Sequence, residues 1–134
     1  MERFIEKQKI YHNIALEELK NGHKESHWMW YIFPQIKGLG YSYNAVYYGI
    51  NNYEEAKLYW QNDYLRNNYL QLCQVLLDFP DKSASDIFGF PDDLKLKSSL
   101  TLFYKVSNEE IIYKTLEKFF NSKFDEHTLE LLNK

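Results

Sequence analysis

Residues Ser26–Gly40 read SHWMWYIFPQIKGLG, an aromatic segment that the rest of the chain has to enclose. The positions from His27 to Phe33 hold two tryptophans, a tyrosine, a phenylalanine, a methionine and an isoleucine, so they offer no polar face to water. We expect a buried helix that Ser26 caps and Pro34 ends. A buried strand is the alternative, because a short apolar run fits both structures. The helical character of nearly every other segment favours the helix.

Length and composition limit the class of protein. The 134 residues predict one domain, spanning 1–134, and the net charge of −3 argues against nonspecific nucleic-acid binding, which needs a concentrated excess of Lys and Arg. One cysteine excludes an internal disulfide and a cysteine-based metal cluster, and the scattered histidines give no metal-binding spacing. No apolar run of about 18 residues is present, so no membrane span is expected. We expect a cytoplasmic protein, and nothing in the sequence implies a cofactor.

Helical signals follow one another along the whole chain. Between Asp63 and Asp78 the apolar side chains recur with the period of a helix, and Pro80 lies just beyond. Three pairs resemble capping boxes, namely Asn52 with Glu55, Ser83 with Asp86 and Ser107 with Glu110. The pattern predicts an all-α fold, an irregular bundle of about eight helices of unequal length. Besides His27–Phe33, the predicted helices are Met1–Asn21, a short one between Ser42 and Gly49, Tyr53–Gln61, Asp63–Asp78, Asp92–Val106, Asn108–Asn121 and, capped by Asp125, Glu126–Leu132; Ala84–Phe88 is predicted to form only a short turn.

A second dense segment runs from Phe88 to Phe103, FGFPDDLKLKSSLTLF. On the helix from Asp92 onward, Leu96, Leu100 and Phe103 form a core stripe, and small hydroxyl side chains occupy much of the remaining circumference. Small hydroxyls indicate the close approach of a neighbouring helix or the lining of a cavity. The simpler interpretation is tight packing, with each hydroxyl bonded to the preceding turn, and we favour it.

The two dense segments resemble the domain-of-unknown-function 1810 family of small bacterial proteins. The resemblance rests on SHWMWYIFPQIKGLG, on YYGI at Tyr47–Ile50 and on IFGFPDDLKLKSSLTLF at Ile87–Phe103, and it extends over nearly the whole chain. It implies a mainly helical, single-domain fold. It implies no activity, cofactor or catalytic residue.

Polar residues inside these two apolar segments are the candidates for a site. Burying such a residue costs free energy unless it is hydrogen-bonded, paired with an opposite charge or part of a functional site. His27 is the candidate catalytic residue, since imidazole suits acid–base chemistry near neutral pH; a structural histidine is the favoured alternative. The loop around Lys37 and Ser42 has the glycines and the helix start that attract anions, although an ordinary turn is the simpler interpretation. The ligand-binding candidates are Trp30, Lys37, Ser42, Tyr48, Asp93, Lys95, Lys97, Ser98 and Thr101.

These residues support two hypotheses of function. The first is a pocket for a small anionic ligand between segments 26–42 and 92–101, in a protein that is a catalyst or a simple binder. It requires that His27, Lys37 and Lys97 converge on one hollow. The alternative is an adaptor that binds a protein partner through an exposed tyrosine-rich surface, since twelve residues are tyrosines. The sequence names neither a reaction nor a substrate.

Overall fold

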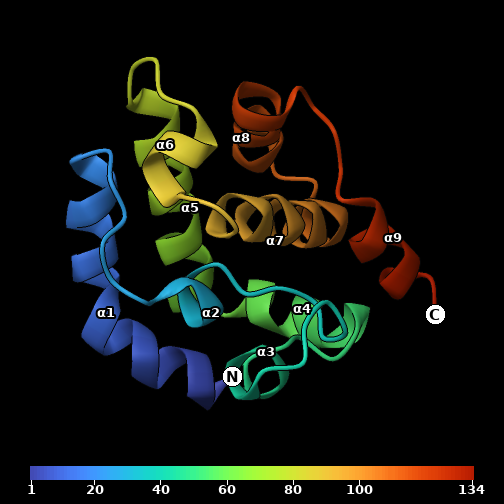
Figure 1. Cartoon of the computed structure of the whole chain (residues 1–134). Helices are drawn as coiled ribbons and strands as arrows, with labels where there is room; N and C mark the ends of the chain where they lie inside the picture. Colours follow the sequence, from blue (N-terminus) through green and yellow to red (C-terminus); the bar gives the residue numbers. More distant parts are fainter.

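The computed structural model describes residues 1–134 and contains nine helices and no strand (Figure 1). The predicted all-α fold is therefore confirmed, with one helix more than expected. None of the helices combines the length and the apolar character that crossing a bilayer would need. The helices are α1 (Glu2–Lys20), α2 (Met29–Ile32), α3 (Tyr43–Tyr47), α4 (Tyr53–Gln61), α5 (Asp63–Asp78), α6 (Ala84–Phe88), α7 (Asp92–Ser107), α8 (Glu110–Phe120) and α9 (Glu126–Leu132).

Helix α7 is the central element of the fold. It packs against α4, α6, α8 and α9, and Figure 1 shows it crossing the middle of the molecule. Its six consecutive residues from Ser98 to Phe103 are all buried, so neighbours cover it on every side. The small hydroxyls make this possible. Ser98 and Thr101 donate to carbonyls one turn back, as predicted, whereas the hydroxyl of Ser99 meets the Tyr69 hydroxyl of α5 at 2.8 Å.

The aromatic segment is buried as expected, but its local structure differs from the prediction. Helix α2 covers only Met29–Ile32, and its first flanking residue is Trp28, which makes no side-chain cap. Ser26 does not cap the helix, because its hydroxyl donates instead to the Glu18 carboxylate of α1 at 2.5 Å. The same carboxylate accepts the Trp28 indole N–H at 2.9 Å. A buried acid on α1 therefore positions the entry to α2.

Two of the three predicted capping boxes differ from the pattern. Ser83 and Asp86 form a complete reciprocal box. The Asn52 side chain accepts from the Glu55 amide, but the Glu55 carboxylate binds the amide of Asn51 and the guanidinium of Arg3. The third prediction is wrong: α8 begins at Glu110 after Glu109, with no side-chain cap.

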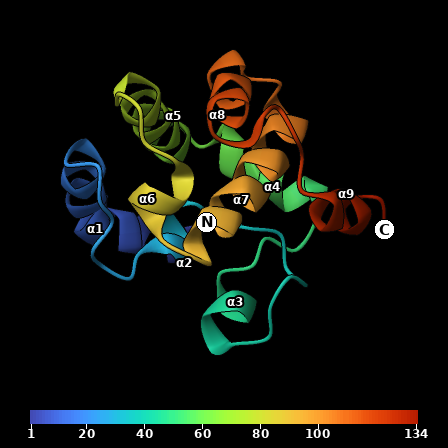
Figure 2. The same ribbon diagram turned by 45° about the horizontal axis from the view of Figure 1, so that its top comes forward.

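The connection around α3 is the least enclosed part of the fold. Helix α3 has no buried residue, and Figure 2 shows it standing away from the other helices. An isolated parallel bridge between Ile36 and Ile50 closes the base of this connection, with Lys37 N to Ile50 O at 2.7 Å. Gly49 is required there, because a Cβ would lie 2.7 Å from the Ala45 carbonyl oxygen and 3.0 Å from the Lys37 Cα. The chain from Gln35 to Gly49 thus forms one wall of a hollow beside α7.

Candidate ligand-binding pocket

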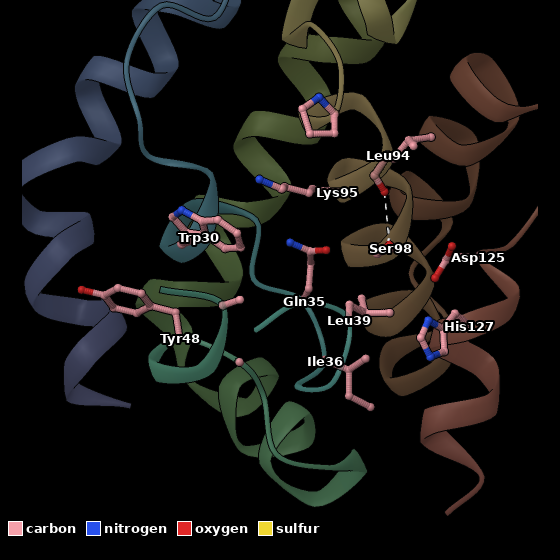
Figure 3. A pocket seen from close by; sticks show the side chains of 14 residues that line it. Trp30, Gln35, Ile36, Leu39, Tyr48, Leu94, Lys95, Ser98, Asp125 and His127 are labelled. Carbon is pink, nitrogen blue, oxygen red and sulfur yellow. Dashed lines mark hydrogen bonds between the residues drawn. The ribbon is translucent and has the colours of Figure 1, made fainter. Parts of the chain in front are cut away.

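A pocket of about 240 Å³ lies between the Gln35–Gly49 connection, the first turns of α7 and the start of α9 (Figure 3). Apolar side chains and a small number of polar groups share its lining, which is the usual composition of a small-molecule site. The lining residues are Trp30, Gln35, Ile36, Leu39, Gly40, Ala45, Tyr48, Gly49, Pro91, Leu94, Lys95, Ser98, Asp125 and His127.

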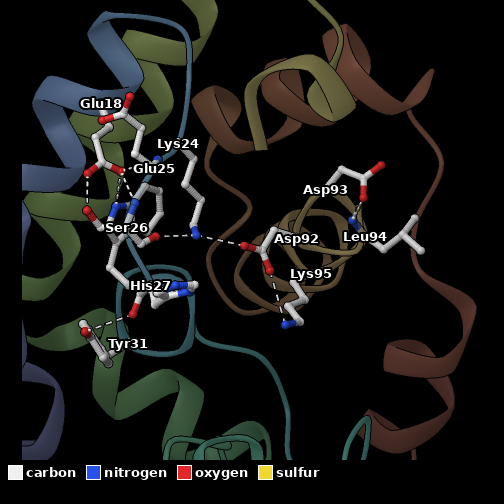
Figure 4. A network of polar contacts seen from close by, with 11 residues as sticks. Glu18, Lys24, Glu25, Ser26, His27, Tyr31, Asp92, Asp93, Leu94 and Lys95 are labelled. Atoms are coloured by element: carbon white, nitrogen blue, oxygen red, sulfur yellow. Dashed lines mark hydrogen bonds and ion pairs between the residues drawn. The ribbon is translucent and has the colours of Figure 1, made fainter. Parts of the chain in front are cut away.

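One end of the pocket carries a cation on an aromatic face. Lys95 Nζ lies 4.0 Å from the centre of the Trp30 ring and 3.2 Å from Asp92 Oδ1. The second oxygen of Asp92 pairs with Lys24 Nζ at 2.9 Å (Figure 4). Two lysines therefore share one carboxylate, and this cluster keeps a net positive charge beside the pocket.

The other end offers two hydrogen-bond acceptors, Asp125 and Ser98, and the His127 imidazole, which has at least one N–H donor. In Figure 3, Asp125 and His127 lie on the far side of Ser98 from Lys95 and Trp30. The Ser98 hydroxyl donates its proton to the Leu94 carbonyl at 3.2 Å, so toward the pocket it can only accept. Asp125 caps α9: its Oδ2 accepts from the amide and the hydroxyl of Thr128, while Oδ1 makes no hydrogen bond within the protein.

Gln35 and Tyr48 line the pocket in different ways. In Figure 3 the Gln35 side-chain amide points between Lys95 and Leu39. The Tyr48 phenol points the other way, toward α1, where its ring packs on Phe4 at a centroid distance of 6.1 Å. Burial, followed by the charges of neighbouring groups, raises the Tyr48 pKa, so the phenol stays neutral at pH 7. Gln35 is therefore a candidate for ligand contact, and Tyr48 supports the wall.

Four of the candidate residues predicted from sequence line this pocket, and six do not. The four are Trp30, Tyr48, Lys95 and Ser98. His27, Lys37, Ser42, Asp93, Lys97 and Thr101 lie outside it. The polar residues of the two segments were predicted to converge on a common hollow. Four of the ten candidates do so, and the other six do not.

The predicted convergence of His27, Lys37 and Lys97 is wrong. The chain becomes helical only at Met29, so His27 precedes α2 and is exposed to solvent. Lys37 is exposed as well. Lys97 follows Lys95 by two residues and therefore lies about 200° around α7 from it.

Ser42, Asp93 and Thr101 have structural contacts instead. Ser42 caps α3 by accepting from the Ala45 amide at 3.2 Å, and the Asp93 carboxylate accepts from the neighbouring Leu94 amide at 2.9 Å. Thr101 donates to Lys97 O and accepts from the Asp125 amide at 2.9 Å. Thr101 thereby fastens the start of α9 to α7, and so holds Asp125 beside the pocket.

Sequence reasoning missed three polar residues of the lining: Gln35, Asp125 and His127. Gln35 belongs to the quoted aromatic segment, directly after Pro34, and no motif distinguishes it from an ordinary loop residue. Asp125 carried only the signal of a helix cap, and that cap is present. No signal in the sequence indicates that α9 packs on α7, so His127 could not be assigned to the same site.

Comparison with known proteins agrees with this fold. The chain superimposes on the crystal structure of the conserved hypothetical protein Rv1873 from Mycobacterium tuberculosis with a TM-score of 0.96. The two sequences are 39% identical, and the match covers 99% of this chain and 96% of the other. No match was found among curated proteins. The model of the family described as "Protein of unknown function (DUF1810)" matches residues 1–132, and the chain therefore belongs to this family.

Proposed function

We propose that this protein binds a small anionic ligand in the pocket between the Gln35–Gly49 connection, α7 and α9, with Lys95 as the partner of the anion. The observation that carries the proposal is the sharing of Asp92 between Lys24 and Lys95. A single carboxylate cannot neutralise two ammonium groups. Lys95 Nζ has three donors, of which Asp92 takes one, so donors remain for a bound carboxylate or phosphate.

The surroundings of Lys95 strengthen an ion pair with a ligand. The Trp30 ring covers one side of the ammonium group at 4.0 Å, and Pro91 and Leu94 contribute apolar surface to the same pocket. Coulomb attraction is larger in such partly dehydrated surroundings than in bulk water. The volume of about 240 Å³ is below the range of about 300–1,000 Å³ that is typical of pockets for drug-sized molecules, so we expect a smaller ligand.

The direct test is a thermal-shift and calorimetric titration with inorganic phosphate and with 4-methylpentanoate, a small apolar carboxylate. At ten times the Kd of either anion, binding stabilises the folded state by about 1.4 kcal/mol, which raises the Tm of a domain of this size by roughly 3–6 °C. We expect Lys95→Met to abolish this shift.

Lys97→Met is the matched control, because it removes the same charge from the same helix outside the pocket. We expect it to keep the ligand-induced shift of the wild type. An equal shift in Lys95→Met, or the absence of any shift in the wild type, would contradict the proposal.

A second candidate function, a protein-interaction adaptor, is favoured by the exposed aromatic side chains around α3. Tyr41 is 92% exposed and Tyr43 is 76% exposed, and the Tyr43 and Tyr47 rings stack at 5.6 Å. Side chains of this kind are frequent at protein interfaces. A partner that binds the wild type and is lost from the Tyr41→Ser/Tyr43→Ser variant, at unchanged Tm, would favour the adaptor. Equal binding by both proteins would remove this candidate.

A further inference from the structure

The two charged groups of the pocket, Lys95 and Asp125, lie toward opposite ends of it, and the His127 imidazole, which has at least one N–H donor, lies beside Asp125. Lys95, a donor, lies with Trp30 at one end, and Asp125, an acceptor, lies at the other end (Figure 3). Lys95 and Ser98 are three residues apart on α7, so they share a face and are displaced by roughly 4.5 Å along the helix axis. The apolar side chains of Ile36, Leu39 and Leu94 belong to the same lining.

The acceptor end is held in place by bonds that leave acceptor capacity unused. Asp125 is fixed by Thr128 through Oδ2, and its backbone amide is fixed by Thr101 of α7. Its Oδ1 has no hydrogen-bond partner in the protein. The buried Ser98 hydroxyl donates its only proton to Leu94 O, so it can only accept a hydrogen bond from a ligand. A carboxylate and a hydroxyl that can only accept suit an ammonium group, whereas they repel a second anionic group.

We infer that the ligand is a small amino carboxylate with an apolar body, whose carboxylate pairs with Lys95 and whose ammonium group pairs with Asp125 and Ser98. This inference rests on the proposed function and names the class of ligand for the same pocket. The Gln35 amide, which has both a donor and an acceptor, points into the space between the two ends (Figure 3) and can bond either ligand group.

The test compares amino carboxylates with the same acids lacking the amino group. The probes are leucine against 4-methylpentanoate, and 6-aminohexanoate against hexanoate, so that a short and a long separation of the two charges are both covered. Isothermal titration calorimetry with the full chain measures each Kd. We expect at least one amino carboxylate to bind tenfold or more tightly than the same acid without the amino group, because its ammonium group adds a charge-assisted hydrogen bond.

Asp125→Asn is the informative variant, because asparagine caps a helix as well as aspartate does but carries no charge. We expect it to lose the preference for the amino compound. Asp81→Asn is the matched control, since it makes the same charge change at an exposed position outside the pocket. Ser98→Ala is a second variant, in which the preference is expected to fall while the fold, followed by its Tm, is kept.

Equal or tighter binding of the deaminated acids by the wild type would overturn the amino-carboxylate assignment and leave the proposed anion site standing. A preference for the amino compound that persists in both Asp125→Asn and Ser98→Ala would overturn the placement of the ammonium group. If none of these acids, nor inorganic phosphate, binds the wild type, both the inference and the proposed function fail.

Discussion

Glu18 shows how a single buried acid fixes the path of the chain. Its carboxylate accepts hydrogen bonds from the amides of Glu25 and Ser26, from the Ser26 hydroxyl and from the Trp28 indole. These donors lie on the segment that leads from α1 into α2. Without the carboxylate the buried Trp28 indole N–H would have no partner, and an unsatisfied buried donor costs free energy.

We predict that Glu18→Gln lowers the free energy of unfolding by roughly 2–4 kcal/mol at pH 7, because the amide of glutamine accepts fewer hydrogen bonds and brings its own donors. Urea unfolding followed by circular dichroism measures the loss. Glu17→Gln is the control, since Glu17 is exposed and adjacent. An equal loss in the two variants would contradict the role assigned to Glu18.

The same residue predicts a pH dependence. Burial acts to raise the Glu18 pKa, but the combined hydrogen bonds from Ser26, Glu25 and Trp28 outweigh it and hold the pKa below its ordinary value of 4.5. A carboxyl group whose pKa is lower in the folded state stabilises the fold fully above its unfolded pKa. This contribution is lost as pH falls from about 4.5 through the folded pKa.

The free energy of unfolding of the wild type should therefore fall more steeply below about pH 4.5 than that of Glu18→Gln. The difference between the two proteins should shrink toward acid pH. Unfolding curves between pH 7 and pH 3 measure it, and a difference that stays constant over this range would contradict the assignment.

At the scale of elements, the carboxyl end of α5 depends on a side chain from another helix. Lys118 of α8 donates to Leu76 O at 2.8 Å, to Leu77 O at 3.1 Å and to Phe79 O. The last carbonyl groups of a helix lack partners within the helix and carry partial negative charge, so an ammonium group placed there is stabilising.

We predict that Lys118→Met lowers the free energy of unfolding by about 1–2 kcal/mol. The control is Lys114→Met on the same helix, because Lys114 only pairs with the exposed Glu110 at 3.1 Å and such surface pairs contribute about 0–1 kcal/mol. Chemical denaturation of the two variants provides the comparison. A loss in Lys118→Met no larger than in the control would show that the α5 terminus does not need this bond.

Local sequence signals predicted the existence and order of most helices, and they failed where the expected capping side chain bonds to another group. Ser83 caps α6 as predicted, and Asp86 completes the reciprocal box. Ser107 was expected to cap α8, but its hydroxyl donates to Phe103 O of its own helix at 2.6 Å. Ser26 likewise binds Glu18 rather than the start of α2. The case of Ser26 is decided by a contact between elements, which a local pattern does not contain, and the case of Ser107 by a competing local bond within α7.

At the scale of the molecule, aromatic rings from four helices or their flanks meet in one cluster. Phe103 of α7 lies 5.0 Å from Tyr69 of α5 and 4.8 Å from Tyr59 of α4, and Tyr69 lies 5.2 Å from Phe33, which follows α2. We predict that Phe103→Ala costs about 3–5 kcal/mol, since it removes buried surface and leaves a cavity. Phe90→Ala is the control at a ring that is 78% exposed. Similar thermal stability of the two variants would contradict this account of the core.

Two of the three walls of the pocket were predictable from sequence, and the third was not. The segments around Trp30 and Lys95 stand out because each combines many apolar residues with a small number of polar ones. The wall from α9 carries no such signal, since Asp125 and His127 look like ordinary residues at a helix start. Their position follows from the packing of α9 on α7 and from the bond between Thr101 and the Asp125 amide. These are long-range contacts.

The central claim, that a ligand binds in the pocket beside Lys95, is tested most directly by the tryptophan indole signals in a ¹H–¹⁵N NMR titration. The chain has three tryptophans, and only Trp30 lines the pocket; Trp28 is buried against Glu18 and Trp60 lies in the aromatic core. Titration with leucine, 6-aminohexanoate or 4-methylpentanoate should shift the Trp30 indole signal, assigned with Trp30→Phe, in a saturable manner and leave the other two in place. A Trp30 signal that does not move at concentrations that saturate the calorimetric binding would contradict the account.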